Sequence, residues 1–146
     1  MTRTIGLIFY LKKENNMPKY GDKTAKALDN YMQNYTIPKG TTRTGLAAPA
    51  KDMFRNYNTM KNMELKESDS FFHCKANYEA TKRSGLYGAA IANIVDTGKE
   101  VKDILINKYP LGDSLRDYRA NLRGQKGALQ RKSLQETCPT HHTKYK

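Results

Sequence analysis

The sequence predicts a mainly α-helical fold, with about five helices in a single small domain. Three observations support this. The length of 146 residues suits one domain with one core. Apolar residues recur at spacings of three and four along several stretches, and Gly or Pro residues separate these stretches. We therefore divide the chain into an N-terminal extension (1–16), a helical domain (17–127) and a basic flexible tail (128–146).

The N-terminal extension contains a short apolar run from Ile5 to Leu11. The run is too short to cross a bilayer. Lys12 and Lys13 follow it without a small-residue cleavage site, which argues against a signal peptide. We expect a short strand or a hydrophobic docking segment here, and Met17 is an alternative natural start. The sequence leaves two alternatives for localisation: the cytoplasm, or export without a recognisable N-terminal signal.

The first two predicted helices each carry one apolar stripe that should face the core. The first begins near Asp22, which can cap it, and ends at about Tyr35. Its stripe consists of Ala25, Leu28, Met32 and Tyr35. A loop rich in Pro, Gly and Thr precedes the second helix, at about 50–65. The stripe of the second helix consists of Met53, Phe54, Tyr57 and Met60.

The third and fourth predicted helices meet at a glycine. The third, over 70–85, is capped by Ser68 or Asp69 and ends at Gly85. Its apolar edge consists of Phe71, Cys74 and Tyr78. The fourth, over 85–109, is the longest and ends before Pro110. Gly98 is a candidate kink in it, and the small residues at 88–92 allow another element to approach closely.

The fifth predicted helix runs from Ser114 to about Arg123, with Asp113 as its cap and Gly124 and Gly127 as stop signals. A helical wheel at about 100° per residue separates its side chains into three stripes. The apolar stripe, which should face the core, is Leu115, Tyr118 and Leu122. An acidic and amide stripe flanks it on one side, with Asp113, Asp117 and Asn121. An arginine stripe flanks it on the other, with Arg116, Arg119 and Arg123.

His73 is the candidate acid–base group, because it is the only histidine outside the tail. Facing carboxylates, it could act as a general base or help to hold a cation. The candidate catalytic residues are His73, Asp113, Asp117 and Asn121. The candidate binding residues are Asn77, Glu100, Asp103, Arg116, Arg119 and Arg123. The alternative is a structural histidine beside a solvated helix, and whether the chain is an enzyme is left open.

The charge of the chain predicts anionic partners. The sequence has 26 Lys+Arg against 14 Asp+Glu, a net charge of +12. Such an excess attracts nucleic acid, a cell-wall polymer or an anionic membrane surface. The motifs GxxxxGK[ST], GxSxG, HExxH and GxGxxG are all missing, so nucleotide hydrolysis, serine-hydrolase and zincin chemistry lack support.

The two cysteines, Cys74 and Cys138, do not by themselves establish a disulfide. We expect Cys74 to be a free thiol that packs as a small hydrophobe, and both cysteines to be dispensable for folding. The tail places Cys138 near His141 and His142, but no second segment with zinc-ligand spacing accompanies them, so we assign no metal. The sequence identifies no cofactor.

Residues 68–127 resemble a module found near the C-termini of Rhs-type and other polymorphic toxin-like proteins of bacteria. The pattern is carried by His73, Cys74, Asn77, Gly88, Ala89, Glu100, Asp103, Asp113, Asp117, Ala120, Asn121 and Gly124. The resemblance implies a small basic bacterial effector, with an acidic immunity protein as its partner and an anionic target. A hydrolase is one form of this hypothesis. The alternatives are a non-catalytic protein that binds nucleic acid or another polyanion, and a structural or phage-type protein.

Overall fold

The computed structural model describes residues 20–39, 47–65, 67–106 and 111–141. Within these ranges it contains five helices and no strand. The helices are α2 (Tyr20–Gln33), α3 (Ala47–Met63), α4 (Asp69–Leu105), α5 (Leu111–Leu129) and α6 (Leu134–Thr137). The fold is therefore mainly α, as predicted. The strand expected near the N-terminus lies outside the described residues.

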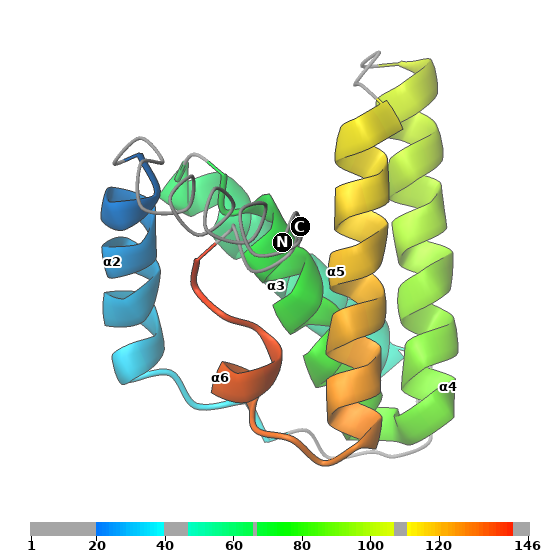
Figure 1. The fold of residues 1–146 in the computed structure, drawn as a ribbon. Coiled ribbons are helices and arrows are strands. Elements are labelled where there is room, and N and C mark those ends of the chain that lie inside the picture. Colours follow the sequence, from blue (N-terminus) through cyan, green and yellow to red (C-terminus); the bar gives the residue numbers. More distant parts are fainter. Residues whose placement is uncertain (1–19, 40–46, 66, 107–110, 142–146) are drawn as a thin grey trace, which may run out of the picture.

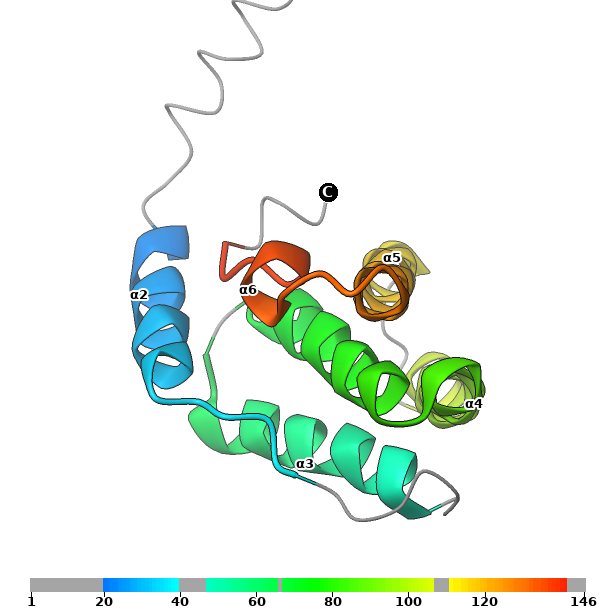
Figure 2. The same cartoon turned by 90° about the horizontal axis from the view of Figure 1, so that it is seen from below.

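Helix α4 is the centre of the fold. It packs against both α3 and α5, and α6 contacts both α4 and α5. Figure 1 shows the second half of α4 running alongside α5. Figure 2 shows α3 on one side of the first half of α4 and α6 on the other. None of the helices in the described ranges combines the length and apolar character needed to cross a membrane.

A break at Gly85 divides α4 into two helical halves. Gly85 has φ 61° and ψ −140°, and it is the non-helical residue inside α4. A positive φ is accessible to glycine without steric cost, so the predicted helix end at Gly85 is confirmed as the bend. The backbones close up beside it, because a Cβ on Gly88 would lie 1.9 Å from the Ala80 carbonyl oxygen. The bend is at Gly85 and not at Gly98, where we expected a kink.

The apolar core lies around the first half of α4 and has two parts. Leu28, Phe72 and Tyr78 belong to the part facing α2 and α5. Met53 and Tyr57 of α3 belong to the other part, with alanines of α4. Phe54 was predicted to face the core with them, but it is 56% exposed. At about 100° per residue, Met53, Tyr57 and Met60 fall within about 60° of one another, whereas Phe54 lies about 100° from Met53, at the outer edge of this face.

Helix α5 is longer than predicted, and it is turned with its apolar side outward. Leu115, Tyr118 and Leu122 are 52%, 55% and 43% exposed, so their prediction as the core-facing stripe is wrong. The helix buries a face of small and polar residues instead, including Asn121 and Gly124. A Cβ on Gly124 would lie 2.1 Å from the Cys74 carbonyl oxygen. The backbones of α4 and α5 therefore approach too closely for large side chains, and Gly124 lies inside the helix instead of stopping it.

The segment at 128–141, expected to be part of a flexible tail, folds back onto α4. It contains the end of α5 and α6, whose N-terminus has a capping box between Ser133 and Glu136. Cys138 is 1% exposed and forms a disulfide with Cys74, so the expectation of a free thiol is wrong. The basic composition of this segment did not indicate that it packs against α4, because a few buried residues are enough to hold a basic segment in place. Residues 142–146 lie outside the described residues.

Candidate functional site

His73 lies in a buried polar network between α4 and α5. Its ring is 0% exposed. Nε2 lies 3.2 Å from Oδ2 of Asp117, and Nδ1 lies 3.1 Å from Oδ1 of Asn121. The structure therefore brings together three of the four predicted catalytic residues. The side chain of the fourth, Asp113, lies outside the described residues.

Tyr57 of α3 and Asp96 of α4 extend this network. The Tyr57 hydroxyl lies 3.3 Å from Nδ1 of His73 and donates to Asp96. Asn77 donates through Nδ2 to Asp96 Oδ2 at 2.9 Å and to Asn121 Oδ1 at 3.0 Å. The network thus connects three helices through groups that would be costly to bury unpaired.

The sequence analysis did not assign Tyr57, Gln125 or Asn93 to this network. Tyr57 was assigned to the core by its apolar spacing, although its hydroxyl needs a polar partner when buried. Gln125 was not considered, yet its Nε2 donates to Asn77 Oδ1 at 2.7 Å and to Asn93 Oδ1 at 2.6 Å. Gln125 continues the four-residue spacing of Asp117 and Asn121, so the signal was present in the sequence.

The predicted binding residues do not gather at one place. Asn77 belongs to the buried network, whereas Arg119 and Arg123 are exposed on α5 and Arg116 is half-buried. Arg123 donates through Nε to the Thr137 carbonyl oxygen at 2.6 Å, which ties α5 to the end of α6. The side chains of Glu100 and Asp103 lie outside the described residues.

The burial of the network suits it to holding helices together. A general base must reach its substrate directly or through one water, and His73 has no exposed surface. The cavity beside α2 and the cavity at the end of α5 are both lined by other residues. Among the described residues, no group of three or more His, Cys, Asp or Glu could hold a metal ion. A catalytic role for His73, Asp117 and Asn121 stays a prediction.

A second buried network surrounds Lys75, where α2 and α3 meet α4. Lys75 is 1% exposed; its Nζ donates to Asn56 Oδ1 at 2.8 Å and lies 3.0 Å from Glu79 Oε1. The ammonium also lies 3.7 Å from the centroid of the Tyr35 ring. Burial lowers the pKa of Lys75 to about 8, although the Glu79 carboxylate opposes this shift.

Glu79 connects this network to the segment after α2 and to α3. Tyr35 donates its hydroxyl to Oε1, and Arg55 donates through Nη2 to Oε2 at 2.7 Å. Burial would raise the pKa of Glu79, but Lys75 and the hydrogen bonds from Tyr35 and Asn56 lower it overall. Sequence reasoning did not find this network. The available signal was the four-residue spacing of Lys75, Glu79 and Arg83.

Arg83 and Asp52 complete the second network at its outer end. Arg83 donates from Nη2 to Asp52 Oδ1 at 2.9 Å and to the Pro38 carbonyl oxygen at 3.0 Å. Arg55 also donates to Asp52 Oδ1, at 2.8 Å. The buried Asp52 carboxylate is thus paired with two arginines, and the segment after α2 is fastened to α4.

Comparison with known proteins gives a family model and several relatives that share one description. The family model described as "Serum amyloid A protein" matches residues 41–141. The chain is 40% identical over 78 residues to serum amyloid A-3 protein of Oryctolagus cuniculus, covering 53% of this chain and 62% of that protein. It is 36% identical over 78 residues to serum amyloid A-5 protein of Mesocricetus auratus, covering 53% and 74%. For serum amyloid A-2 protein of Neovison vison, the identity is 35% over 65 residues, covering 44% and 50%.

These matches overturn the bacterial interpretation. The resemblance to Rhs-type toxin modules rested on short polar spacings at His73, Asp113 and Asn121, and the family match covers the same residues. The effector, its acidic immunity partner and its anionic polymer target are therefore wrong, as are the nucleic-acid-binding and phage-type alternatives. Spacings of four are common to any packed helix, so they could not distinguish the two families. This chain belongs to the serum amyloid A family.

Proposed function

We propose that this chain binds a lipid surface of the kind found on high-density lipoprotein particles. Serum amyloid A is an acute-phase apolipoprotein that associates with such particles. The chain aligns with 62% of the rabbit relative and 50% of the mink relative, so this function is inferred from family membership together with the surface of the described residues.

The outward apolar stripe of α5 is the observation that carries the proposal. The exposed side chains are Leu115, Tyr118, Leu122 and Leu129. At about 100° per residue they fall within about 60° of one another around the helix axis. Such a stripe costs free energy in water and gains it at a lipid surface, at roughly 25 cal/mol for each Å² of apolar area buried.

Cations lie beside this stripe on the same helix. Arg119, Arg123 and Lys126 are exposed and follow the apolar side chains by one residue or four. An exposed apolar stripe with Lys and Arg next to it is typical of helices that lie in the plane of a lipid interface. The net charge of +12 would add attraction to anionic headgroups.

The second half of α4 adds apolar surface next to α5. Leu86 and Ile94 are 74% and 68% exposed, and Tyr87 is 42% exposed. Tyr87 and Ile94 are seven residues apart and therefore lie on the same side of the helix. Both helices of the pair shown at the right of Figure 1 thus bury polar groups and expose apolar ones.

Vesicle flotation tests the proposal. We expect the chain to float with phosphatidylcholine vesicles, and more strongly when they contain an anionic lipid. The double variant Leu115→Ser/Leu122→Ser should weaken partitioning about tenfold, because two exposed leucines leave the lipid contact. Its stability should hardly change, since both side chains are already exposed.

The matched control is Asn58→Ser/Asn62→Ser, which alters two exposed polar residues of α3. It should float like the unaltered chain. Equal flotation of the leucine variant and this control would show that α5 does not contact the lipid, and would overturn the proposal.

A further inference from the structure

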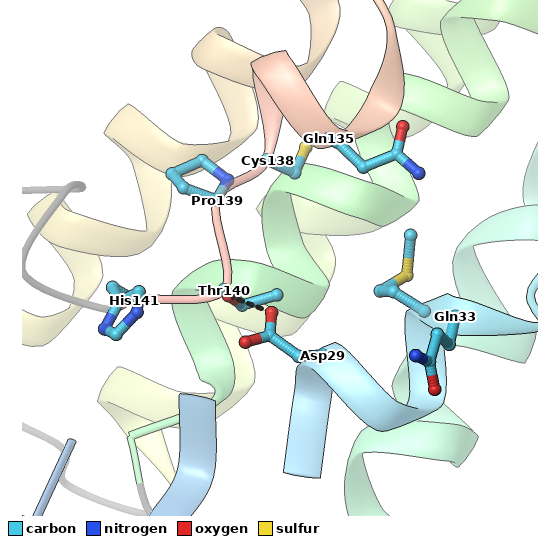
Figure 3. Close-up of a pocket in the computed structure, with 8 residues that line it drawn as sticks. Asp29, Gln33, Gln135, Cys138, Pro139, Thr140 and His141 are labelled. Atoms are coloured by element: carbon cyan, nitrogen blue, oxygen red, sulfur yellow. Dashed lines mark hydrogen bonds between the residues drawn. The ribbon is translucent and has the colours of Figure 1, made fainter. Parts of the chain in front are cut away.

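A cavity of about 540 Å³ lies between α2 and the segment that follows α5. Figure 3 shows Asp29 and Gln33 of α2 facing the chain from Gln135 to His141. The lining residues are Asp29, Met32, Gln33, Gln135, Cys138, Pro139, Thr140 and His141. The volume falls in the range of about 300–1,000 Å³ that is usual for small-molecule sites.

Three of the eight residues that line this cavity lie outside the matched family region. The family match begins at residue 41, and the wall formed by Asp29, Met32 and Gln33 precedes it. The cavity therefore lies between the matched family region and α2, which precedes that region. Its opposite wall is held by the disulfide from Cys138 to Cys74 and by the capping box of α6.

The charge of the cavity is opposite to that of the molecule. The sequence has 26 Lys+Arg among 146 residues, but none of the eight lining residues is a lysine or arginine. Asp29 supplies a carboxylate, and Thr140 orients it by donating from Oγ1 to Oδ1 at 2.6 Å (Figure 3). This carboxylate, in a lining that holds no lysine or arginine, favours a positively charged ligand group over an anionic one.

The buried part of the lining contains sulfur. Met32 is 9% exposed and Cys138 is 1% exposed, and they contribute a thioether and a disulfide. Polarisable sulfur makes favourable contacts with aromatic rings, worth about 0.3–1.5 kcal/mol for a thioether. The Pro139 ring adds a third apolar surface to the same wall.

We propose that this cavity binds a small primary amine that carries one aromatic ring. The ammonium group would pair with Asp29, and the ring would lie against Met32 and Cys138. The amide side chains of Gln33 and Gln135 line the remaining walls and offer hydrogen bonds to a polar substituent on the ring. The site is independent of the lipid contact proposed for α5.

Ligand-observed NMR on the full disulfide-bonded chain tests this site with three probes. 2-Phenylethylamine has both features, 2-phenylethanol lacks the charge, and ethylamine lacks the ring. We expect saturable binding of 2-phenylethylamine and binding at least about tenfold weaker for each of the other two, a factor of ten being about 1.4 kcal/mol. Equal affinity for 2-phenylethanol, or no saturable binding of the amine, would overturn the proposal.

Variants locate the binding within the cavity. Asp29→Asn should lower the affinity for 2-phenylethylamine about tenfold, and Gln135→Phe should block binding by filling the cavity. Both positions are exposed, so neither change should disturb the fold. Glu64→Gln removes the same charge from an exposed position at the end of α3 and should leave the affinity unchanged. A similar loss in Glu64→Gln and Asp29→Asn would show general charge attraction and would also overturn the site.

Discussion

His73 on α4 and Asn121 on α5 are 48 residues apart in the chain, and Nδ1 of the one lies 3.1 Å from Oδ1 of the other. Both side chains are buried, at 0% and 3% exposure. The contact between these helices is therefore polar at its centre, while Leu86 and Ile94 of α4 and Leu115 and Leu122 of α5 are exposed. This arrangement leads to predictions about stability that differ from those for an ordinary helix pair.

Replacing Asn121 by Leu should destabilise the protein even though the new residue is apolar. His73 and Asn77 would each lose a buried partner, and an unpaired buried polar group costs about 1–3 kcal/mol. We expect urea unfolding, followed by circular dichroism, to show a loss of about 2 kcal/mol or more. Arg119→Leu, at an exposed position of the same helix, should change the value by less than about 0.5 kcal/mol. A stabilised Asn121→Leu would show that the polar network is not needed.

Two glycine-to-alanine changes should have opposite effects. In Gly124→Ala the new Cβ would collide with the Cys74 carbonyl oxygen, 2.1 Å away, so α5 must move off α4. We expect a loss of about 1–3 kcal/mol, as for other overpacked sites. In Gly98→Ala the new Cβ meets nothing within 4 Å, and the helix gains up to about 1 kcal/mol. Thermal melting of the two variants checks both signs, and a destabilised Gly98→Ala would contradict the helix at that position.

The disulfide between Cys74 and Cys138 should contribute substantially to stability, because it closes a loop with a sequence separation of 64. Reduction is expected to lower the free energy of unfolding by about 2–4 kcal/mol. The measurement is urea unfolding with and without a reductant. In Cys138→Ser the reductant should have no effect, and the stability should match that of the reduced chain. Identical curves for the oxidised and reduced chain would rule out this contribution.

Lys75 should make the stability depend on pH above neutrality. Its pKa is lowered to about 8 in the folded state by burial, whereas an unfolded lysine has the ordinary value of 10.5. Between these values the unfolded state binds more protons, so the free energy of unfolding rises with pH, by on the order of 1 kcal/mol per pH unit. Below pH 8 both states are protonated and the contribution is constant.

Urea unfolding between pH 7.5 and 9.8 measures this slope. Lys75→Met should remove the rise, since Glu79 keeps hydrogen bonds from Arg55 and Asn56. Lys51→Met, at an exposed position of α3, should retain it. A slope that survives in Lys75→Met must come from another group.

Much of the helical architecture could be predicted from the sequence. The apolar spacing of Leu28 and Met32 placed α2, and glycine at 85 marked the bend inside α4, because both signals act over a few residues. His73, Asp117 and Asn121 were also grouped from the sequence as candidate catalytic residues, and the structure places them in contact. Gly124 was misread, since a glycine that ends a helix and one that admits a neighbouring backbone have the same identity in the sequence.

The helices and the stripes along them can be read from the order of the residues, because both follow from local geometry. Which stripe of α5 faces inward depends on the packing of α5 against the rest of the fold. This helix has Leu115 and Leu122 on one side and Asp117 and Asn121 on the other. Either side can be buried, depending on the surface of the helix that it packs against. Here α4 offers His73 and Asn77 as polar partners and a close backbone at Cys74, so the polar face is satisfied inside and the leucines stay out. Whether a buried polar group finds a hydrogen-bond partner depends on residues far away in the chain. For this reason, the periodicity of α5 alone could not show which of its sides is buried.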